Sequence, residues 1–90
     1  MMLCICTHEA EWQGYQRLRK DGVKVNTNTS KHLVLYHGVE IVGAVYIILL
    51  TGERMKVVDI KVKGKQIYGY MIALLQSWAR SKNMSLVNTA

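Results

Sequence analysis

The chain has 90 residues, of which 50% are hydrophobic and 20% are charged, and its formal net charge is +6. This composition is typical of a globular protein and excludes the disordered and fibrous classes. The length predicts a single domain over residues 1–90, because two domains would leave each half too small for its own core. The longest apolar run, Ile41 to Leu50, is too short to span a membrane as a helix, so we expect no membrane partner.

The excess of positive charge predicts a partner that carries phosphate, which can be a nucleic acid, an anionic membrane or a nucleotide-containing cofactor. The N-terminal sequence MMLCICTHEAEW lacks the basic and apolar segments of a secretory signal, so we expect a cytoplasmic protein with reduced thiols at Cys4 and Cys6. A metal site built from these cysteines and His8 is not predicted, since no second pair of ligands with zinc spacing follows.

The first part of the chain is predicted to form a strand and then a helix. Residues 2–6 are interpreted as a short strand, and Thr7 as the N-cap of a helix that continues to about Lys20 and ends at Gly22. Trp12 and Tyr15 lie on one side of this helix, so it is expected to pack through a narrow aromatic stripe. The polar residues 26–31 are predicted to be a loop.

Three strands follow, because the sequence becomes rich in branched and aromatic residues. Residues 32–37 and 40–50 are predicted to form an antiparallel hairpin around a turn at Gly38 and Val39. Residues 55–62 form the next strand. Strict alternation along it places Val58, Ile60 and Val62 on one face, with Val57, Asp59 and Lys61 on the other.

The helical period returns after residues 63–66, with Ile67, Met71 and Trp78 at steps of three or four. This helix is predicted to end near Asn83, and the segment MSLV that follows it is interpreted as a strand parallel to residues 55–62. The predicted fold class is therefore α+β, a mixed and mainly antiparallel sheet with flanking helices, in the order strand, helix, three antiparallel strands, helix, strand.

The junction between residues 55–62 and the second helix has the features of an anion site. A strand that ends in a short loop and leads into a helix directs free backbone N–H groups and the positive end of the helix dipole at one point. Lys61, Lys63 and Lys65 surround this point in the sequence. The alternative is that these lysines only keep an ordinary strand-to-helix junction solvated.

The segments HLVLYHGVEIVGAVYI, MKVVDIKV, KGKQIYGYMIALLQSWARSKN and MSLV, in this order, resemble the GNAT superfamily of acyl-CoA-dependent N-acetyltransferases. The segment EWQGYQRLRK is similar to the first helix of that family, which flanks the acceptor site. The resemblance implies acetyl-CoA as co-substrate and an amine acceptor of unknown identity. It also implies that loop N–H groups hold the coenzyme pyrophosphate, that the preceding strand pairs with pantetheine, and that a base takes the amine proton.

The resemblance places coenzyme contacts at ten consecutive residues: Ile60, Lys61, Val62, Lys63, Gly64, Lys65, Gln66, Ile67, Tyr68 and Gly69. The family's loop has the form Q/R-x-x-G-x-G/A. Placed at Lys63, this pattern puts Gln66 and Tyr68 at its two small positions. Shifted to start at Gln66, it puts Gly69 at the glycine and Met71 at the last small position. Both placements depart from the family, because side chains there obstruct a close backbone approach.

Asp59 is the candidate catalytic base implied by the resemblance, and a solvated or lysine-paired carboxylate of no catalytic role is the alternative. His32 and His37 are interpreted as surface histidines. Tyr68 and Tyr70 are interpreted as packing residues rather than as an acid for the leaving thiolate.

The resemblance covers nearly the whole chain, but the chain lacks the C-terminal third of the family's domain. The open sheet edge at residues 84–89 is therefore expected to pair with a second copy in a homodimer. Two alternatives to an acetyltransferase remain. One is a catalytically silent dimerisation module of GNAT-like fold, and the other is a small basic nucleic-acid-binding domain. The second is disfavoured because the aromatic residues are poorly interleaved with the lysines.

Overall fold

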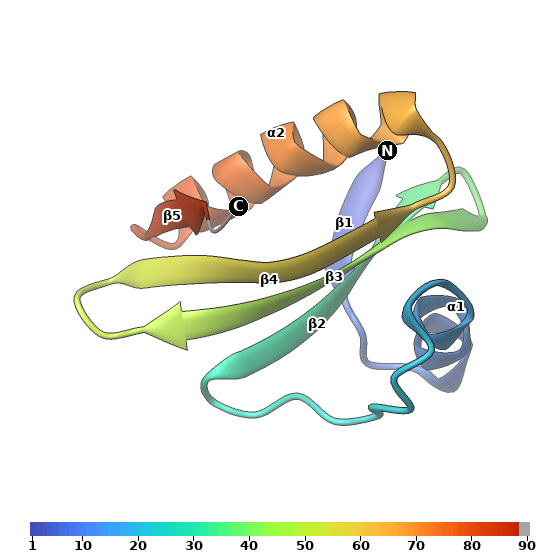
Figure 1. Cartoon of the computed structure of the whole chain (residues 1–90), viewed down its shortest axis with the longest axis horizontal. Helices are drawn as coiled ribbons and strands as arrows, with labels where there is room; N and C mark the ends of the chain where they lie inside the picture. The colour runs from blue at the N-terminus through green and yellow to red at the C-terminus, as the bar shows by residue number, and fades with distance from the viewer. Residues whose placement is uncertain (89–90) are drawn as a thin grey trace.

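The computed structural model describes residues 1–88, which form five strands and two helices (Figure 1). In chain order these are β1 (Met2–Ile5), α1 (Glu9–Arg19), β2 (Ser30–His37), β3 (Glu40–Leu50), β4 (Arg54–Val62), α2 (Lys65–Ser81) and β5 (Ser85–Asn88). This order and the α+β class confirm the sequence-based fold prediction. Neither helix in this part of the chain is long and apolar enough to cross a bilayer.

All five strands belong to one sheet in the order β1-β2-β3-β4-β5. The first three pairs are antiparallel and the last, β4 with β5, is parallel, as predicted. The two helices lie on opposite faces of this sheet (Figure 1). The sheet therefore has an α1 face and an α2 face, and each carries its own apolar cluster.

The larger cluster fills the α2 face and is almost free of solvent exposure. Its buried members include Leu33, Leu35, Val45, Ile47, Met55, Met71 and Leu75. Gly43 allows α2 to pack closely here, because a β-carbon at that position would stand 2.6 Å from Cε of Met71. The smaller cluster joins α1 to the other face through the predicted aromatic stripe, in which Trp12 and Tyr15 are both buried.

A β-bulge in β4 changes the faces on which its side chains lie. Tyr46 pairs with Asp59, whereas the next residue, Ile47, pairs with Val57. Val58 is the extra residue, and it is 40% exposed, while Val57 packs with Ile60 and Val62 against the α2-face cluster. The predicted grouping of Val58 with Ile60 was wrong, because one inserted residue shifts the two-residue period by one position.

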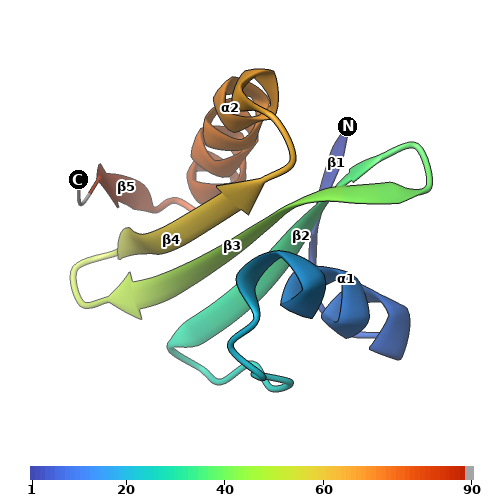
Figure 2. The same cartoon turned by 45° about the vertical axis from the view of Figure 1, so that its right-hand side comes forward.

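The pairing of β4 with β5 lies on the N-terminal side of the bulge. Within residues 1–88, β5 pairs with β4 from Arg54 to Val57. From Val58 to Val62, β4 has no strand on its outer side within residues 1–88 (Figure 2). The second half of β4 therefore presents an open backbone edge that leads directly to the start of α2.

The ends of α1 differ from the prediction. His8, not Thr7, is the N-cap, and Lys20, not Gly22, holds the left-handed C-cap conformation with φ of 60°. Glu11 explains the first difference, because its Oε1 accepts the backbone N–H groups of both Thr7 (2.9 Å) and His8 (3.3 Å). The side chain of Glu11, in the first turn of the helix, thus accepts the backbone N–H groups of the two residues that precede the helix. The loop before β2 also ends earlier than predicted, at residue 29.

Glu11 is expected to be important for stability, because it is buried and also accepts the hydroxyl of Tyr36 through Oε2 at 3.2 Å. Burial alone would raise the pKa of Glu11, but the hydrogen bonds from Thr7, His8 and Tyr36 outweigh it and hold this pKa below the ordinary value of 4.5. The stabilisation is therefore complete above about pH 4.5 and is lost as the pH falls through the lowered pKa.

We predict that Glu11→Ala lowers the free energy of unfolding by about 2 kcal/mol at pH 7, and that the difference from wild type shrinks below pH 4. Urea denaturation measures both effects. Glu9→Ala removes an exposed acid from the same helical turn and should stay within about 0.5 kcal/mol of wild type. Equal losses in the two variants would contradict this assignment.

Candidate functional site

The junction between β4 and α2 leaves several backbone donors without an acceptor. Gly64 is the N-cap of α2, with an extended backbone, and no side chain caps the helix. Lys63 N–H donates to Val42 O, and Ile67 N–H donates to Gly64 O, both at 3.0 Å. The N–H groups of Gly64, Lys65 and Gln66 have no acceptor within the described part of the chain. Three donors and the positive end of a 17-residue helix therefore meet at one point.

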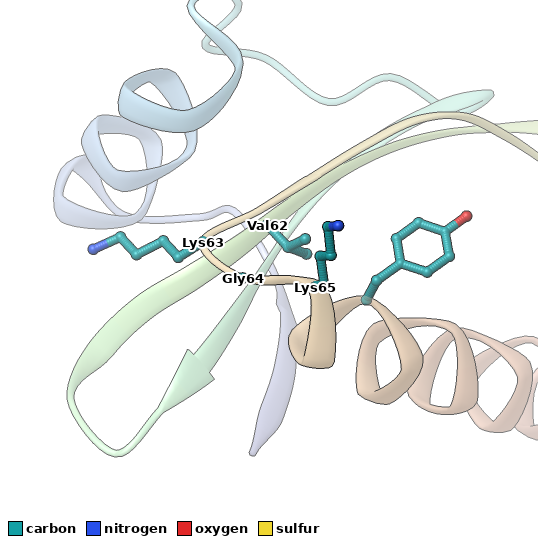
Figure 3. Close-up of a pocket in the computed structure, with 5 residues that line it drawn as sticks. Val62, Lys63, Gly64 and Lys65 are labelled. Carbon is teal, nitrogen blue, oxygen red and sulfur yellow. The ribbon is translucent and has the colours of Figure 1, made fainter.

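A cavity of about 480 Å³ lies at this point and is lined by Val62, Lys63, Gly64, Lys65 and Tyr68. Figure 3 shows that the Lys65 side chain extends beside Val62, whereas Lys63 points away from the start of α2. No acidic residue occupies the first turn of α2. The cavity thus has a backbone anion site and one nearby lysine, which suits a phosphate group.

Lys63 forms an ion pair with Glu40, and this contact was not predicted from the sequence. The Lys63 Nζ to Glu40 Oε2 distance is 2.7 Å, and both side chains are about half exposed. The hydrogen bond and charge of Lys63 lower the pKa of Glu40. The prediction that three lysines surround the junction was therefore only partly right. Lys63 is engaged elsewhere, and Lys61 is an exposed residue of β4 that does not line the cavity.

The other residues predicted to contact the coenzyme lie in different surroundings. Ile60 and Ile67 pack against the α2-face cluster, and Gln66 is exposed. Gly69 lies in the second turn of α2, outside the loop, and no atom stands within 4 Å of where its β-carbon would be. Met71 is fully buried. Both motif placements therefore put their small positions inside α2, and only the placement from Lys63 has its first position in the loop.

The two tyrosines of the first turns of α2 are not packing residues. Tyr68 is 49% exposed and Tyr70 is 58% exposed, so the predicted packing role was wrong for both. Tyr68 instead lines the cavity beside Lys65. The apolar stripe of α2 is carried by Met71, Leu75 and Ala79, which leaves the positions of the tyrosines on the solvent side.

Asp59 lies on the α1 face, directly after the bulge. Its Oδ2 accepts a hydrogen bond from Nε of Arg19 at 3.2 Å, and its side chain is 36% exposed. The ion-paired alternative is therefore observed, although the partner is an arginine from α1. A catalytic role for Asp59 remains a prediction.

A buried polar network links Asp59 to β2 and was not predicted. His32 is 3% exposed, so its interpretation as a surface histidine was wrong. Its Nδ1 lies 2.7 Å from the hydroxyl of Tyr15, and its ring stacks on Tyr46 with centroids 4.7 Å apart. Nη1 of Arg19 donates to the same hydroxyl and to Asp21. No sequence signal identified this network, because nothing in the chain showed which face of β2 the short α1 covers.

Metal binding has no comparable support. Within residues 1–88, no group of three or more histidine, cysteine, aspartate and glutamate side chains could hold a metal ion. Cys6 is a buried free thiol, and burial raises its pKa to about 12.

Because His32 is buried, we expect the stability of the protein to depend on pH. Burial lowers the pKa of His32 below its ordinary value of 6.5, so the folded state favours the neutral ring. The stabilisation is complete above pH 6.5 and is lost as the pH falls through the lowered pKa. We predict that the urea midpoint of the wild type decreases as the pH is lowered from 7 to 5. His32→Gln should be less stable at pH 7, but its urea midpoint should decrease less over the same pH range. Equal decreases in the two proteins would contradict the burial of a neutral imidazole.

No protein-family model matches the chain, and no curated protein matches it. Solved structures do match. An aminoglycoside 6'-N-acetyltransferase from Acinetobacter haemolyticus is 13% identical, with a TM-score of 0.67 over 100% of this chain and 79% of that one. A ribosomal-protein-alanine N-acetyltransferase from Brucella melitensis biovar Abortus 2308 is 20% identical, with a TM-score of 0.67 over 99% of this chain and 79% of that one.

A third structure is that of AAC(6')-Iy in complex with a bisubstrate analogue, CoA-S-monomethyl-acetylneamine. It is 11% identical, with a TM-score of 0.67 over 100% of this chain and 80% of that one. An aminoglycoside 6'-N-acetyltransferase from Enterococcus faecium is larger, and this chain covers 57% of it. At these identities the likeness concerns the fold, and the chain has the GNAT fold of N-acetyltransferases.

Proposed function

We propose that the protein binds acetyl-CoA at the start of α2 and transfers its acetyl group to an amine. The observation that carries this proposal is the set of three N–H groups, at Gly64, Lys65 and Gln66, that have no acceptor within residues 1–88, at a helix start where Gly64 and Lys65 line a cavity of about 480 Å³. A diphosphate supplies the acceptors that these donors lack, and the helix dipole favours its charge. Lys65 adds a charge-assisted contact.

The open half of β4 extends the site away from the diphosphate. Residues 58–62 lead directly into the loop, and their outer edge has no strand partner within residues 1–88. An extended chain with amide groups can pair with such an edge in the way an added strand does. The pantetheine arm of the coenzyme has this chemistry, so it would lie along the outer edge of β4 at residues 58–62, with the thioester toward the bulge. The structure of AAC(6')-Iy with its CoA-containing analogue supports a coenzyme in this fold.

Transfer of the acetyl group requires the protein to position the amine against the thioester and to supply one base. The amine nitrogen attacks the thioester carbon, a C–N bond forms, and the C–S bond breaks to release the thiolate of coenzyme A. The amine must give up a proton, and the thiolate must gain one. Asp59 is proposed as the base, because it is the acidic residue of β4 and stands directly after the bulge.

The outer edge of β5 fits the homodimer expected from the sequence. Within residues 1–88, β5 has β4 as its strand neighbour and no strand on its other side. An exposed strand edge favours pairing with a second strand, and a second copy of the chain is the proposed source.

We predict that acetyl-CoA raises the melting temperature. A ligand bound by the native state alone contributes about 2.7 kcal/mol when its concentration is 100 times Kd. Lys65→Glu places a negative charge in the cavity and should remove most of this shift. Lys24→Glu makes the same charge change at an exposed lysine that is distant in sequence from the cavity. This variant should retain the increase in melting temperature. A wild type without a shift, or equal shifts in the two variants, would contradict the proposed site.

A second prediction concerns the Lys63–Glu40 ion pair. Glu40→Gln removes the partner that holds Lys63 away from the junction. The freed lysine can then turn toward the bound diphosphate, so acetyl-CoA should bind about two- to fivefold more tightly, within the range of an exposed ion pair. Titration calorimetry measures the change. Weaker binding in Glu40→Gln would show instead that the observed position of Lys63 is the one that the coenzyme needs.

A further inference from the structure

A second cavity, of about 380 Å³, lies between α1 and the hairpin of β2 and β3. It is lined by one face of α1, by the end of β2, by the hairpin turn with the start of β3, and by Lys63. Its volume falls within the range of ~300 to 1,000 Å³ that is typical of pockets for small organic ligands. Nothing in the proposed coenzyme chemistry uses this cavity.

The helix and the hairpin give the cavity apolar walls. Ala10, Gly14 and Leu18 recur every four residues along α1, so they share one face of the helix. Ile41 of the hairpin packs directly against this face, because a β-carbon at Gly14 would collide with its Cδ1 atom. An organic ligand can bury its hydrocarbon part against these residues.

Val39 adds an exposed apolar side chain to the lining. It is 98% exposed and follows Gly38, which has a positive φ of 64°, in the hairpin turn. In turns of this kind glycine is commonly followed by asparagine, aspartate or serine. The turn therefore does not require a branched apolar residue at position 39, where the side chain lines the cavity.

Arg17 supplies the cavity with a free cation. Its side chain is exposed and forms no ion pair or hydrogen bond with any residue of the described range 1–88. The other two charged residues of the lining, Lys63 and Glu40, are paired with each other at 2.7 Å. Two positive charges and one negative charge leave the lining with a net charge of +1, which favours an anion.

We propose that this cavity binds a small organic acid, whose carboxylate pairs with the guanidinium of Arg17 and whose hydrocarbon part lies against Leu18, Val39 and Ile41. A guanidinium can donate two parallel hydrogen bonds to one carboxylate, which fixes the orientation of the ligand as well as its charge. This inference goes beyond the proposed function and does not rest on it.

The test is a titration of ¹⁵N-labelled protein at pH 7, followed by NMR, with three probes. Hexanoate combines a carboxylate with a hydrocarbon chain, acetate has the charge without the chain, and hexan-1-ol has the chain without the charge. We expect hexanoate to shift the Nε–H signal of Arg17 and the amide signal of Val39, and to bind at least about fivefold more tightly than either other probe. Equal binding of acetate or of hexan-1-ol, or no shift with hexanoate, would overturn the proposal.

Three variants at exposed positions test the two halves of the site. Arg17→Gln removes the cation and should weaken hexanoate binding at least about fivefold. Val39→Asn removes the apolar side chain at a turn position that suits asparagine, so it should fold normally and also bind hexanoate more weakly. Lys20→Gln removes an exposed cation at the end of the same helix, outside the cavity lining, and should bind like the wild type. Unchanged affinity in Arg17→Gln, or an equal loss in Lys20→Gln, would contradict the assignment.

A titration with CoA present separates this site from the proposed coenzyme site, because Lys63 lines both cavities. CoA should shift the amide signals of Gly64, Lys65 and Gln66, and hexanoate should still shift Arg17 when CoA is bound. Complete displacement of hexanoate by CoA would make the cavity a part of the coenzyme site and would overturn the separate site. If CoA shifts nothing at the start of α2, the proposed function fails, and the hexanoate titration still decides whether this cavity binds an organic acid.

Discussion

The β-bulge at Val58 is the feature on which the arrangement of the site depends. One extra residue in β4 shifts the side-chain alternation, so that Val57 instead of Val58 joins Ile60 and Val62 at the α2-face cluster, while Asp59 lies on the α1 face. A regular strand of the same sequence would have placed Asp59 differently relative to its apolar neighbours.

The two faces of the sheet then have separate roles. The α2 face holds the larger apolar cluster and the helix whose start is the proposed anion site. The α1 face holds a polar network that is buried and satisfied, with no buried side-chain polar atom lacking a partner within the described residues. Because a buried network is costly to break, it keeps Arg19 in one position, with Asp59 as a partly exposed partner at its edge. The proposed phosphate site thus lies at the end of β4, and the carboxylate of Asp59 lies on the α1 face of the same strand.

Much of the fold could be predicted from local patterns. The glycine turn at residues 38–39, the branched residues of β2 and β3, and the helical period from Ile67 onward are signals that neighbouring residues carry by themselves. The parallel pairing of β5 followed from the handedness of a strand–helix–strand connection. Resemblance to a known family added the expected fold as a whole, which the solved structures bear out.

The details of the site could not be predicted, because they depend on residues that are distant in the sequence. Lys63 meets Glu40 across 23 positions, and Arg19 meets Asp59 across 40. The bulge has no glycine or proline to mark it, and His32 is buried only because α1 crosses β2 at that point. The number of lysines near the start of α2 therefore overestimated the positive charge at the cavity, since Lys63 is paired with Glu40.

Hydrogen exchange, measured residue by residue with and without acetyl-CoA, tests the central claim most directly. The open edge of β4 and the start of α2 should form one continuous coenzyme site. Residues 58–62 and the N–H groups of Gly64, Lys65 and Gln66 should then exchange more slowly when the coenzyme is bound, while the edge of β1 is unchanged. Slower exchange spread evenly over the sheet, or confined to residues outside 58–66, would contradict this account.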